Sequence, residues 1–451
     1  MTDRPKTAFD IPNIRWFIAF RVFFNSRFYY PVFTILFLDF GLTVAQFSIL
    51  NAVWAATIVL SEVPSGAVAD IIGRKRLLNF AAGVMIVEIG IISFMPRIDP
   101  VLIFSVFLVN RVLSGLAEAA ASGADEALAY DSLNEAGLAD QWGRVLEVLM
   151  RYQAIGFVIA MTIGAAVYDP HLMGRVADWM GLGVALTQEV TMRFPLYLTF
   201  VLALLAFIST LKMTEPEQAA AESSDQSVKQ TLAVTLNAGI WIMKTPFVLW
   251  VMLFGMLLDG TIRMVITLSS QYYRMIGIPE SLFGIMGSVV ALLGVVVPKI
   301  ARRIAENRSP QAALLITAGL TVTGLAAMNG FWHWVGILPA LVTFAAMNFT
   351  GFFVSFYINR ETDSRQRATV LSFKGLSYNV SYGLLGVAYA LVLKLSRTGM
   401  DPTADLSPEM IENQVFVDTF FWFPLFFTVN FLVLAAVGVF RYRRRSGSHL
   451  H

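Results

Sequence analysis

Long apolar stretches, each about the length needed to cross a lipid bilayer, recur along the whole 451-residue chain. Hydrophobic residues make up 57% of the sequence and charged residues only 14%, whereas soluble domains carry about 25% charged residues. Because a helix of roughly 20 apolar residues spans the hydrocarbon core, the sequence predicts an all-α integral membrane protein. Twelve transmembrane helices are expected, at residues 14–40, 44–69, 77–96, 101–124, 145–168, 194–212, 247–270, 281–301, 311–331, 334–358, 368–395 and 417–440.

Basic residues are distributed unevenly over the loops between these spans. If both termini lie in the cytoplasm, 21 of the 33 Lys and Arg residues fall on the cytoplasmic side and 6 on the opposite side. Cytoplasmic loops of membrane proteins carry such an excess of basic residues. The distribution therefore predicts a multi-pass protein of the cell inner (plasma) membrane, with an even number of spans and both termini cytoplasmic.

A polar interruption between the sixth and seventh spans divides the chain into halves. We expect an N-terminal bundle of six helices at 1–212, a cytoplasmic linker at 213–246, a C-terminal bundle of six helices at 247–445 and a tail at 446–451. Within the linker, apolar residues at helical spacing over 228–243 predict a short helix on the membrane surface. Six spans on either side of a central linker are typical of transporters built from two parallel repeats.

The short loop between the second and third spans reads Gly66-Ala-Val-Ala-Asp70-Ile-Ile-Gly73-Arg74-Lys75-Arg76. It resembles the signature loop of the major facilitator superfamily, whose members are secondary transporters with two six-helix bundles. In that family the loop is a cytoplasmic latch that holds the outward-open state. The resemblance implies that Gly66, Asp70, Gly73 and Arg74 form this latch, with an acidic partner for Arg74 among Asp125, Glu126 and Asp131. The alternative is a basic turn that only anchors the chain at the membrane boundary.

The fourth span places four small or charged side chains on one helix face: Arg111, Gly115, Glu118 and Ser122. An Arg followed four residues later by Gly resembles a second motif of the superfamily, in which the Arg is tied to proton coupling. Arginine does not lose its proton in a protein, but it stabilises the ionised form of a nearby carboxylate. We expect Glu118 to be that carboxylate, and a structural ion pair that holds the bundle is the alternative.

Ionisable side chains inside the spans are costly, so each is a candidate for the substrate or proton pathway. Asp259 and Arg263 are four residues apart and are expected to pair with each other, which fits a structural role as well as a functional one. The predicted pathway comprises Arg21, Asn25, Arg27, Glu62, Arg111, Glu118, Asp259, Arg263, Lys374 and Tyr378. Glu88 in the third span is a further buried acid, and Tyr382 shares a helix face with Lys374 and Tyr378.

The sequence excludes several kinds of chemistry. It has no cysteine, so disulfides, thiolate metal sites and cysteine nucleophiles are ruled out. It has no Gly-x-x-x-x-Gly-Lys-Ser/Thr, Gly-x-Ser-x-Gly or His-Glu-x-x-His motif. We therefore expect no enzyme, no metal and no cofactor, with a proton gradient as the energy source. A net charge of +2 gives no reason to expect a nucleic-acid partner. The expected partners of a monomer are a small-molecule substrate and membrane lipid.

The prediction is a secondary active transporter that moves a small organic solute by alternating access, coupled to protons. The cationic side chains at membrane depth give a weak bias toward an anionic or zwitterionic solute. The segments that follow the fourth span and enter the eleventh resemble bacterial efflux-like members, which favours export. The fifth span lacks the Gly-Pro-x-x-Gly-Gly ending of many antiporters, which argues against drug–proton antiport. A passive lipid scramblase, a transporter-like receptor and, more remotely, an intramembrane enzyme are the alternatives.

Overall fold

The computed structural model describes residues 7–97, 99–216, 237, 239–362, 364–399 and 407–447. At residues 63, 66, 67, 70, 71, 291, 295, 364–369, 372 and 439–447 it describes the backbone alone. Every regular element within these ranges is a helix, as the apolar stretches predict. Most of the predicted surface helix at 228–243 lies outside the described residues, although residues 239–244 are helical.

Eleven helices in the described part of the chain are long and apolar enough to cross a membrane. The predicted first span, 14–40, is not continuous, and this prediction was wrong. It consists of α1 (Pro12–Asn25), a non-helical segment at 26–29, the 3-10 turn η2 (Tyr30–Val32) and α2 (Phe33–Asp39). Pro31 explains part of the interruption, because proline has no backbone donor and disfavours helix at the residue before it.

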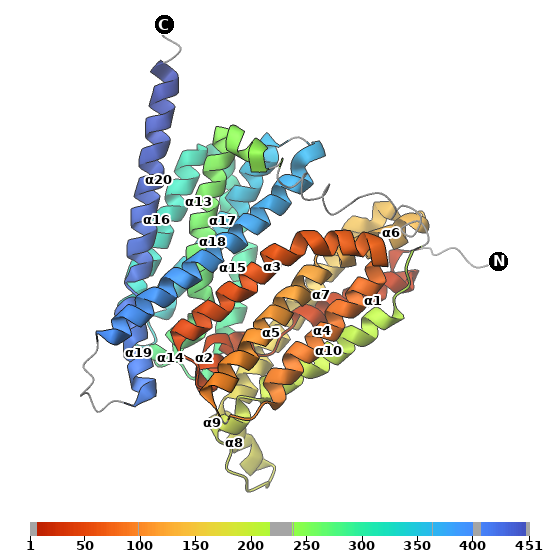
Figure 1. The fold of residues 1–451 in the computed structure, drawn as a ribbon, viewed down its shortest axis with the longest axis vertical. Coiled ribbons are helices and arrows are strands. Elements are labelled where there is room, and N and C mark those ends of the chain that lie inside the picture. Colours follow the sequence, from red (N-terminus) through yellow and green to blue (C-terminus); the bar gives the residue numbers. More distant parts are fainter. Residues whose placement is uncertain are drawn as a thin grey trace, which may run out of the picture. The chain divides into compact units, whose positions relative to one another are not determined.

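The chain divides into two compact units. Unit 1 takes in the described residues of Met1–Leu42, Val53–Leu232 and Pro279–Ser288. Within it, α4 packs against α5 and α10, and α1 packs against α6, α7 and α10 (Figure 1). Besides α1 and α2, its helices are α4 (Arg74–Phe94), α5 (Pro100–Ala121), α6 (Ala124–Glu135), α7 (Trp142–Tyr168), α8 (Pro170–Trp179), α9 (Gln188–Thr191) and α10 (Phe194–Lys212), with 3-10 turns η1 (Ala8–Asp10), η3 (Ala139–Gln141) and η4 (Glu280–Leu282).

Unit 2 takes in the described residues of Thr43–Ala52, Ala233–Ile278 and Val289–His451. Within it, α17 packs against α16 and α13, and α13 also packs against α18 and α20. Its helices are α13 (Pro246–Thr267), α14 (Ser269–Met275), α16 (Pro310–Met328), α17 (Ile337–Glu361), α18 (Ser364–Thr398), α19 (Pro408–Thr419) and α20 (Trp422–Gly447). Two long helices, α3 (Val44–Ile72) and α15 (Phe283–Asn307), have residues in both units.

Four helices begin with the same kind of dipeptide, an Asp or Ser followed by Pro. The side chain of the first residue accepts a hydrogen bond from a backbone N–H in the first turn, and the proline occupies the first helical position, where no N–H is required. These starts are Asp99-Pro100, Asp169-Pro170, Ser309-Pro310 and Ser407-Pro408. The second and fourth of them begin the short helices α8 and α19.

Glycine allows close backbone contact where helices cross in unit 1. Gly115 of α5 lies against α3, and a Cβ added there would come within 2.8 Å of the Cβ of Thr57 and 3.0 Å of the backbone oxygen of Trp54. Gly164 of α7 lies directly against the backbone carbonyl of Phe28, in the interrupted first span. Small residues at such crossings are a common basis of helix association in membranes, where lipid is as apolar as the protein.

Candidate substrate and proton pathway

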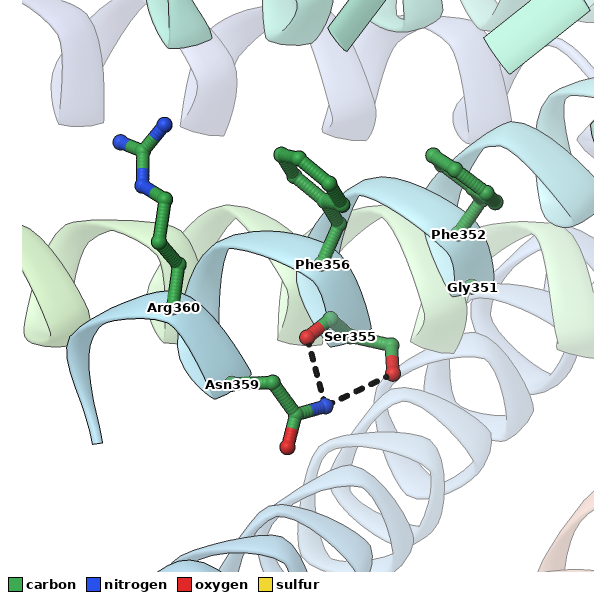
Figure 2. Close-up of a pocket in the computed structure, with 6 residues that line it drawn as sticks. All are labelled: Gly351, Phe352, Ser355, Phe356, Asn359 and Arg360. Atoms are coloured by element: carbon green, nitrogen blue, oxygen red, sulfur yellow. Dashed lines mark hydrogen bonds between the residues drawn. The ribbon is translucent and has the colours of Figure 1, made fainter. Parts of the chain in front are cut away.

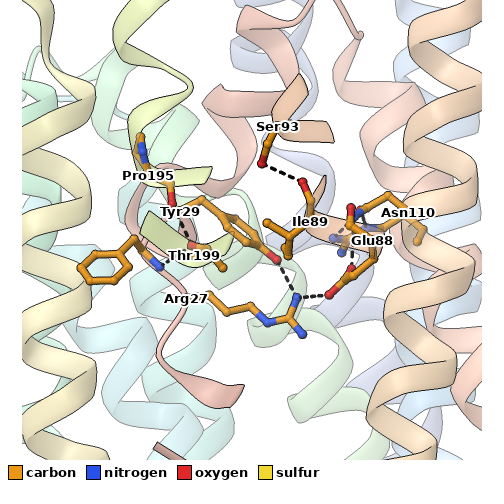
Figure 3. Close-up of polar contacts among 10 residues, drawn as sticks. Arg27, Tyr29, Glu88, Ile89, Ser93, Asn110, Pro195 and Thr199 are labelled. Atoms are coloured by element: carbon orange, nitrogen blue, oxygen red, sulfur yellow. Dashed lines mark hydrogen bonds and ion pairs between the residues drawn. The ribbon is translucent and has the colours of Figure 1, made fainter. Parts of the chain in front are cut away.

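The interruption of the first span is stabilised by groups from other helices of unit 1. The backbone N–H of Phe28 donates to Oγ1 of Thr199 on α10 at 3.0 Å (Figure 3), and the N–H of Ser26 still bonds to the Val22 carbonyl at 3.0 Å. Non-helical backbone at membrane depth is tolerated only where its polar groups find partners in the protein. The segment at 26–29 satisfies this condition.

Arg27 points from this segment into the interior of unit 1. Its Nη1 donates to Oε1 of Glu88 on α4 at 2.6 Å and to the hydroxyl of Tyr29 at 3.0 Å (Figure 3). Asn110 of α5 donates to Oε2 of the same carboxylate at 3.1 Å. Arg27 is 3% exposed and Glu88 is 0% exposed. The predicted pathway residue Arg27 is therefore neutralised by a buried partner that the sequence offered only as a separate candidate.

Arg111 does not pair with Glu118, so the expected partnership was wrong. Its Nε and Nη2 donate to Oδ1 of the neighbouring Asn110 at 3.2 and 3.1 Å. Its guanidinium also lies over the rings of Phe33 and Phe37, at 5.2 and 5.4 Å from their centroids. Seven residues along a helix correspond to about 10 Å of rise, which places Glu118 too far along α5 for a direct ion pair.

The carboxylate of Glu118 makes no hydrogen bond or ion pair with any described residue. It is half-buried on α5, near enough to Arg27 and Arg21 to be influenced by their charges. Glu62 of α3 also lacks a side-chain partner among the described residues, and it interacts electrostatically with Glu118. Unit 1 therefore contains two neighbouring carboxylates, on different helices, that form no direct ion pair with any cation in the described part of the chain.

Two other predicted pathway residues of α1, Arg21 and Asn25, form hydrogen bonds within unit 1. Nη1 of Arg21 donates to Oδ2 of Asp125 on α6 at 2.9 Å, and Nη2 lies 3.4 Å from Oε1 of Glu126. Asn25 donates to the backbone oxygen of Arg21 at 2.9 Å, within the same helix. Arg21 thus joins α1 to α6, and it contacts two of the three acids that the sequence analysis considered as partners of Arg74.

Arg74 forms its ion pair with Asp131, the third acid that the sequence analysis considered. The assignment of Asp125 and Glu126 to the latch was wrong in this respect, because both contact Arg21. Asp131 lies further along α6, and its carboxylate and the Arg74 guanidinium are each about a quarter exposed. The side chains of Gly66 and Asp70 lie outside the described part of the structure.

Glu215 binds the loop between α3 and α4, a contact that the sequence analysis did not predict. Its carboxylate accepts hydrogen bonds from the backbone N–H groups of Arg74 at 2.9 Å and Lys75 at 2.7 Å. These are the first N–H groups of α4, and a negative charge at a helix N-terminus is stabilised by the helix dipole. Gly73 precedes them with φ of +93°, a conformation that favours glycine. The signal available in the sequence was an acid directly after the sixth span.

The predicted charged residues of unit 2 lie between α13 and α18. Asp259 and Arg263 pair as expected, and Nη1 of Arg263 also donates to Oδ1 of Asn379 at 3.0 Å. The ammonium of Lys374 lies 5.8 Å from the centroid of the Tyr378 ring. The hydroxyl of Tyr378 is buried without a hydrogen-bond partner in the described residues. These residues form one polar cluster. Its members come from two helices that the sequence analysis had treated separately.

A cavity of about 720 Å³ opens along one face of α17 (Figure 2). The described residues that line it all belong to α17: Gly351, Phe352, Ser355, Phe356, Asn359 and Arg360. Pockets for small molecules usually enclose about 300–1,000 Å³ and combine apolar walls with a few polar groups. The volume falls within this range and the lining combines apolar with polar groups, but the cavity is largely open rather than enclosed.

Comparison with known proteins agrees with this architecture. The profile described as Major Facilitator Superfamily matches residues 15–386. No curated protein sequence matches the chain. Three solved structures of similar fold are the nucleoside transporter NupG (TM-score 0.69, 14% identity, covering 94% of this chain and 98% of that one), a bacterial homologue of the human lysosomal transporter Spinster (0.68, 14%, 97% and 97%) and the D-xylose–proton symporter (0.61, 11%, 93% and 97%). Because the family profile covers most of the sequence and the helical fold agrees with it, this chain belongs to the major facilitator superfamily of secondary transporters.

Proposed function

We propose that this protein is a proton-coupled transporter of a small organic solute, in which Glu118 carries the proton. The family implies a small-molecule substrate, and its members are typically not enzymes. The observation that supports the coupling is the state of Glu118, a membrane-depth carboxylate without an ion pair in the described part of the chain. Glu88 and Asp259, by contrast, each have an arginine partner.

The chemistry of coupling requires a group that changes protonation as its surroundings change. A carboxylate paired directly with arginine stays ionised, because the opposite charge favours that form. A carboxylate without such a partner becomes neutral in a dry environment and ionises when water reaches it. Alternating access supplies this change of environment, since the two conformations expose a site to opposite sides of the membrane. Glu118 meets the requirement, and Glu62 is placed to influence it.

Two relatives of similar fold are described as proton-coupled, a D-xylose–proton symporter and a proton-dependent oligopeptide transporter. Their identity to this chain is 11% and 14%, so their descriptions supply a precedent only. For direction we propose export, on the resemblance of two segments to efflux-like members, at 122–133 and 367–372. We also propose the inner membrane as its location, with both termini cytoplasmic, on the distribution of Lys and Arg.

The test uses the purified protein in liposomes with an imposed pH gradient and a panel of small organic ions and amphiphiles. We expect gradient-driven movement of at least one solute by the wild-type protein. Glu118→Gln should lose gradient-driven accumulation while it retains exchange of the solute at equal pH. Glu306→Gln is the matched control, because Glu306 is 55% exposed at the end of α15. Normal gradient-driven accumulation by Glu118→Gln would contradict the proposal.

The same liposomes separate the alternative functions. A passive scramblase would move a fluorescent lipid between leaflets without any gradient and without the solute. A receptor would bind a solute from the panel and never move it. Either result, obtained with protein that is well folded by size-exclusion chromatography, would replace the transporter assignment for this chain.

A further inference from the structure

Helix α17 has two faces of different character. One face carries Phe353, Val354, Tyr357 and Ile358, each no more than 1% exposed and packed in the hydrophobic core of unit 2. The other face carries the six residues that line the cavity, of which Phe352 and Phe356 are half-buried and also pack against the edge of that core. They form two parallel rows along the helix, because residues four apart lie above one another. One row is Phe352, Phe356 and Arg360, and the other is Gly351, Ser355 and Asn359.

The aromatic row consists of two half-buried rings followed by a positive charge. The rings of Phe352 and Phe356 are stacked, with centroids 5.9 Å apart and an interplanar angle of 11°. Arg360 follows one turn later and points to the same side of the helix (Figure 2). Its side chain is 50% exposed, and its Nε lies 3.5 Å from Oε1 of Glu361. A carboxylate on a ligand could therefore bond to the terminal nitrogens of this guanidinium.

The polar row offers hydrogen-bonding groups beside the rings. Nδ2 of Asn359 donates to the backbone oxygen of Ser355 at 2.8 Å and to its Oγ at 3.2 Å. These bonds fix the orientation of the amide, so that its Oδ1 points away from the helix (Figure 2). Gly351 has no side chain, and a Cβ added there would meet nothing within 4 Å. The space beside the aromatic row is therefore open.

A face directed at lipid would have a different composition. The exposed large residues of α20 illustrate such a face, with Leu425, Val429, Leu432 and Val433 all apolar. Ser355 lies within the predicted span 334–358, where a polar group against hydrocarbon is costly, and Asn359 and Arg360 follow at the cytoplasmic end of that span. The composition of the α17 face fits contact with water and a solute.

We propose that this face binds an amphipathic organic anion, with a planar apolar group on Phe352 and Phe356 and an acidic group on Arg360. The inference rests on the proposed transporter function and names its substrate class. Successive turns of a helix are separated by about 5.4 Å. The apolar group and the acid must accordingly be joined closely, as in an aromatic carboxylate of two rings. Arginine suits the acid, because its planar guanidinium bonds a carboxylate with two nitrogens.

The test measures binding of biphenyl-4-carboxylate to the full chain in phosphatidylcholine nanodiscs, without any ion gradient. Its neutral amide, biphenyl-4-carboxamide, is the matched probe without charge. We expect the acid to bind at least about tenfold more tightly than the amide, which is the scale of one hydrogen bond to a charged group. Arg360→Gln should abolish that difference, and Arg360→Lys should keep part of it.

Variants of the aromatic row give a second, independent readout. Phe352→Leu and Phe356→Leu should weaken binding of the acid and of the amide by the same factor, because both probes contain the rings. Phe421→Leu and Arg302→Gln are the matched controls, since Phe421 is 56% exposed in the turn between α19 and α20 and the side chain of Arg302 is 68% exposed. Equal binding of both probes by the wild-type protein, or unchanged binding of the acid by Arg360→Gln, would overturn the inference.

Two further measurements distinguish solute binding at this face from lipid binding and from proton coupling. If phosphatidylglycerol in the nanodiscs displaces the acid from wild-type protein, the anion site belongs to lipid and the inference is wrong. Glu118→Gln should bind the acid like the wild-type protein, so a failure of proton coupling leaves this result intact. Conversely, gradient-driven transport of another solute, together with no binding of the acid, would overturn the substrate class alone.

Discussion

Arg27 and Glu88 form an ion pair of 2.6 Å between an interrupted first span and α4, and neither side chain is more than 3% exposed. Asn110 and Tyr29 supply the additional hydrogen bonds. A buried pair is stable only when such partners satisfy the remaining polar atoms. The pair and its hydrogen bonds thereby fix the path of the non-helical segment relative to two helices of unit 1, α4 and α5.

Removal of one partner from this pair should destabilise the protein strongly. Glu88→Gln leaves Arg27 buried with its charge uncompensated, which costs about 3–5 kcal/mol. We expect a large fall in the thermal unfolding midpoint of the detergent-solubilised protein, or failure to fold. The double variant Arg27→Gln/Glu88→Gln should recover part of the loss. The surface pair of Arg97 and Glu189 is the control, where Arg97→Gln should cost less than about 1 kcal/mol. Equal effects of Glu88→Gln and Arg97→Gln would contradict this account.

The ion pair between Arg74 and Asp131 should be recoverable by exchange of its charges. Arg74→Asp places two acids together and should slow transport about tenfold, which corresponds to about 1.4 kcal/mol in a barrier. Arg74→Asp/Asp131→Arg restores opposite charges and should restore most of the rate. The measurement is initial uptake into liposomes under the same pH gradient. If the double variant is slower than the single one, the pair is not the relevant contact of Arg74.

The carboxylate of Glu215 should stabilise the start of α4. Glu215→Ala removes the acceptor for two backbone N–H groups, and loss of a helix cap costs about 1 kcal/mol. Glu215→Gln keeps an acceptor but loses the charge at the helix N-terminus, so its effect should be smaller. Thermal unfolding of both variants provides the comparison. A Gln variant that is less stable than the Ala variant would show that capping is not the role of this residue.

Gly164 should tolerate no side chain. A Cβ at this position would overlap the carbonyl oxygen of Phe28, which belongs to the backbone and is held in place by its neighbours. Gly164→Ala should therefore cost at least about 1–3 kcal/mol, the usual range for an overpacked core. Gly319→Ala on α16 is the matched control, because a Cβ there meets nothing within 4 Å. In the helix interior that change should stabilise by about 0.5–1 kcal/mol. Similar unfolding midpoints for the two variants would refute the predicted overlap.

The sequence predicted the helical architecture well because the signal for a span lies in the span itself. Each apolar stretch of sufficient length implies a helix, whatever its neighbours are. The interruption of the first span was missed for a physical reason. Its ordering depends on Thr199 and Glu88, which lie 171 and 61 residues from their partners. The only local signals of a helix interruption in the sequence were Pro31 and the preceding Asn25-Ser26 pair.

Partners of charged residues were predicted less well than their positions. The pair of Asp259 and Arg263 is internal to one helix, and its spacing alone determined the contact. Arg74 had three acids on one helix to choose from, and the packing of α4 against α6 selects among them. The cavity face of α17 was missed almost entirely. None of its residues is unusual for a membrane helix when taken alone. They are recognised as one face only when the structure shows that the opposite face of α17 is buried in the core.

The hydrogen bond from Phe28 to Thr199 has a consequence for biogenesis. The N-terminal end of the chain leaves the ribosome long before Thr199 is synthesised, and until then the amide of Phe28 lacks its native acceptor. Unsatisfied amides are expensive in hydrocarbon, so the nascent segment cannot hold its mature shape during insertion. The native interruption is therefore a late event of assembly, completed only after the sixth crossing has entered the membrane.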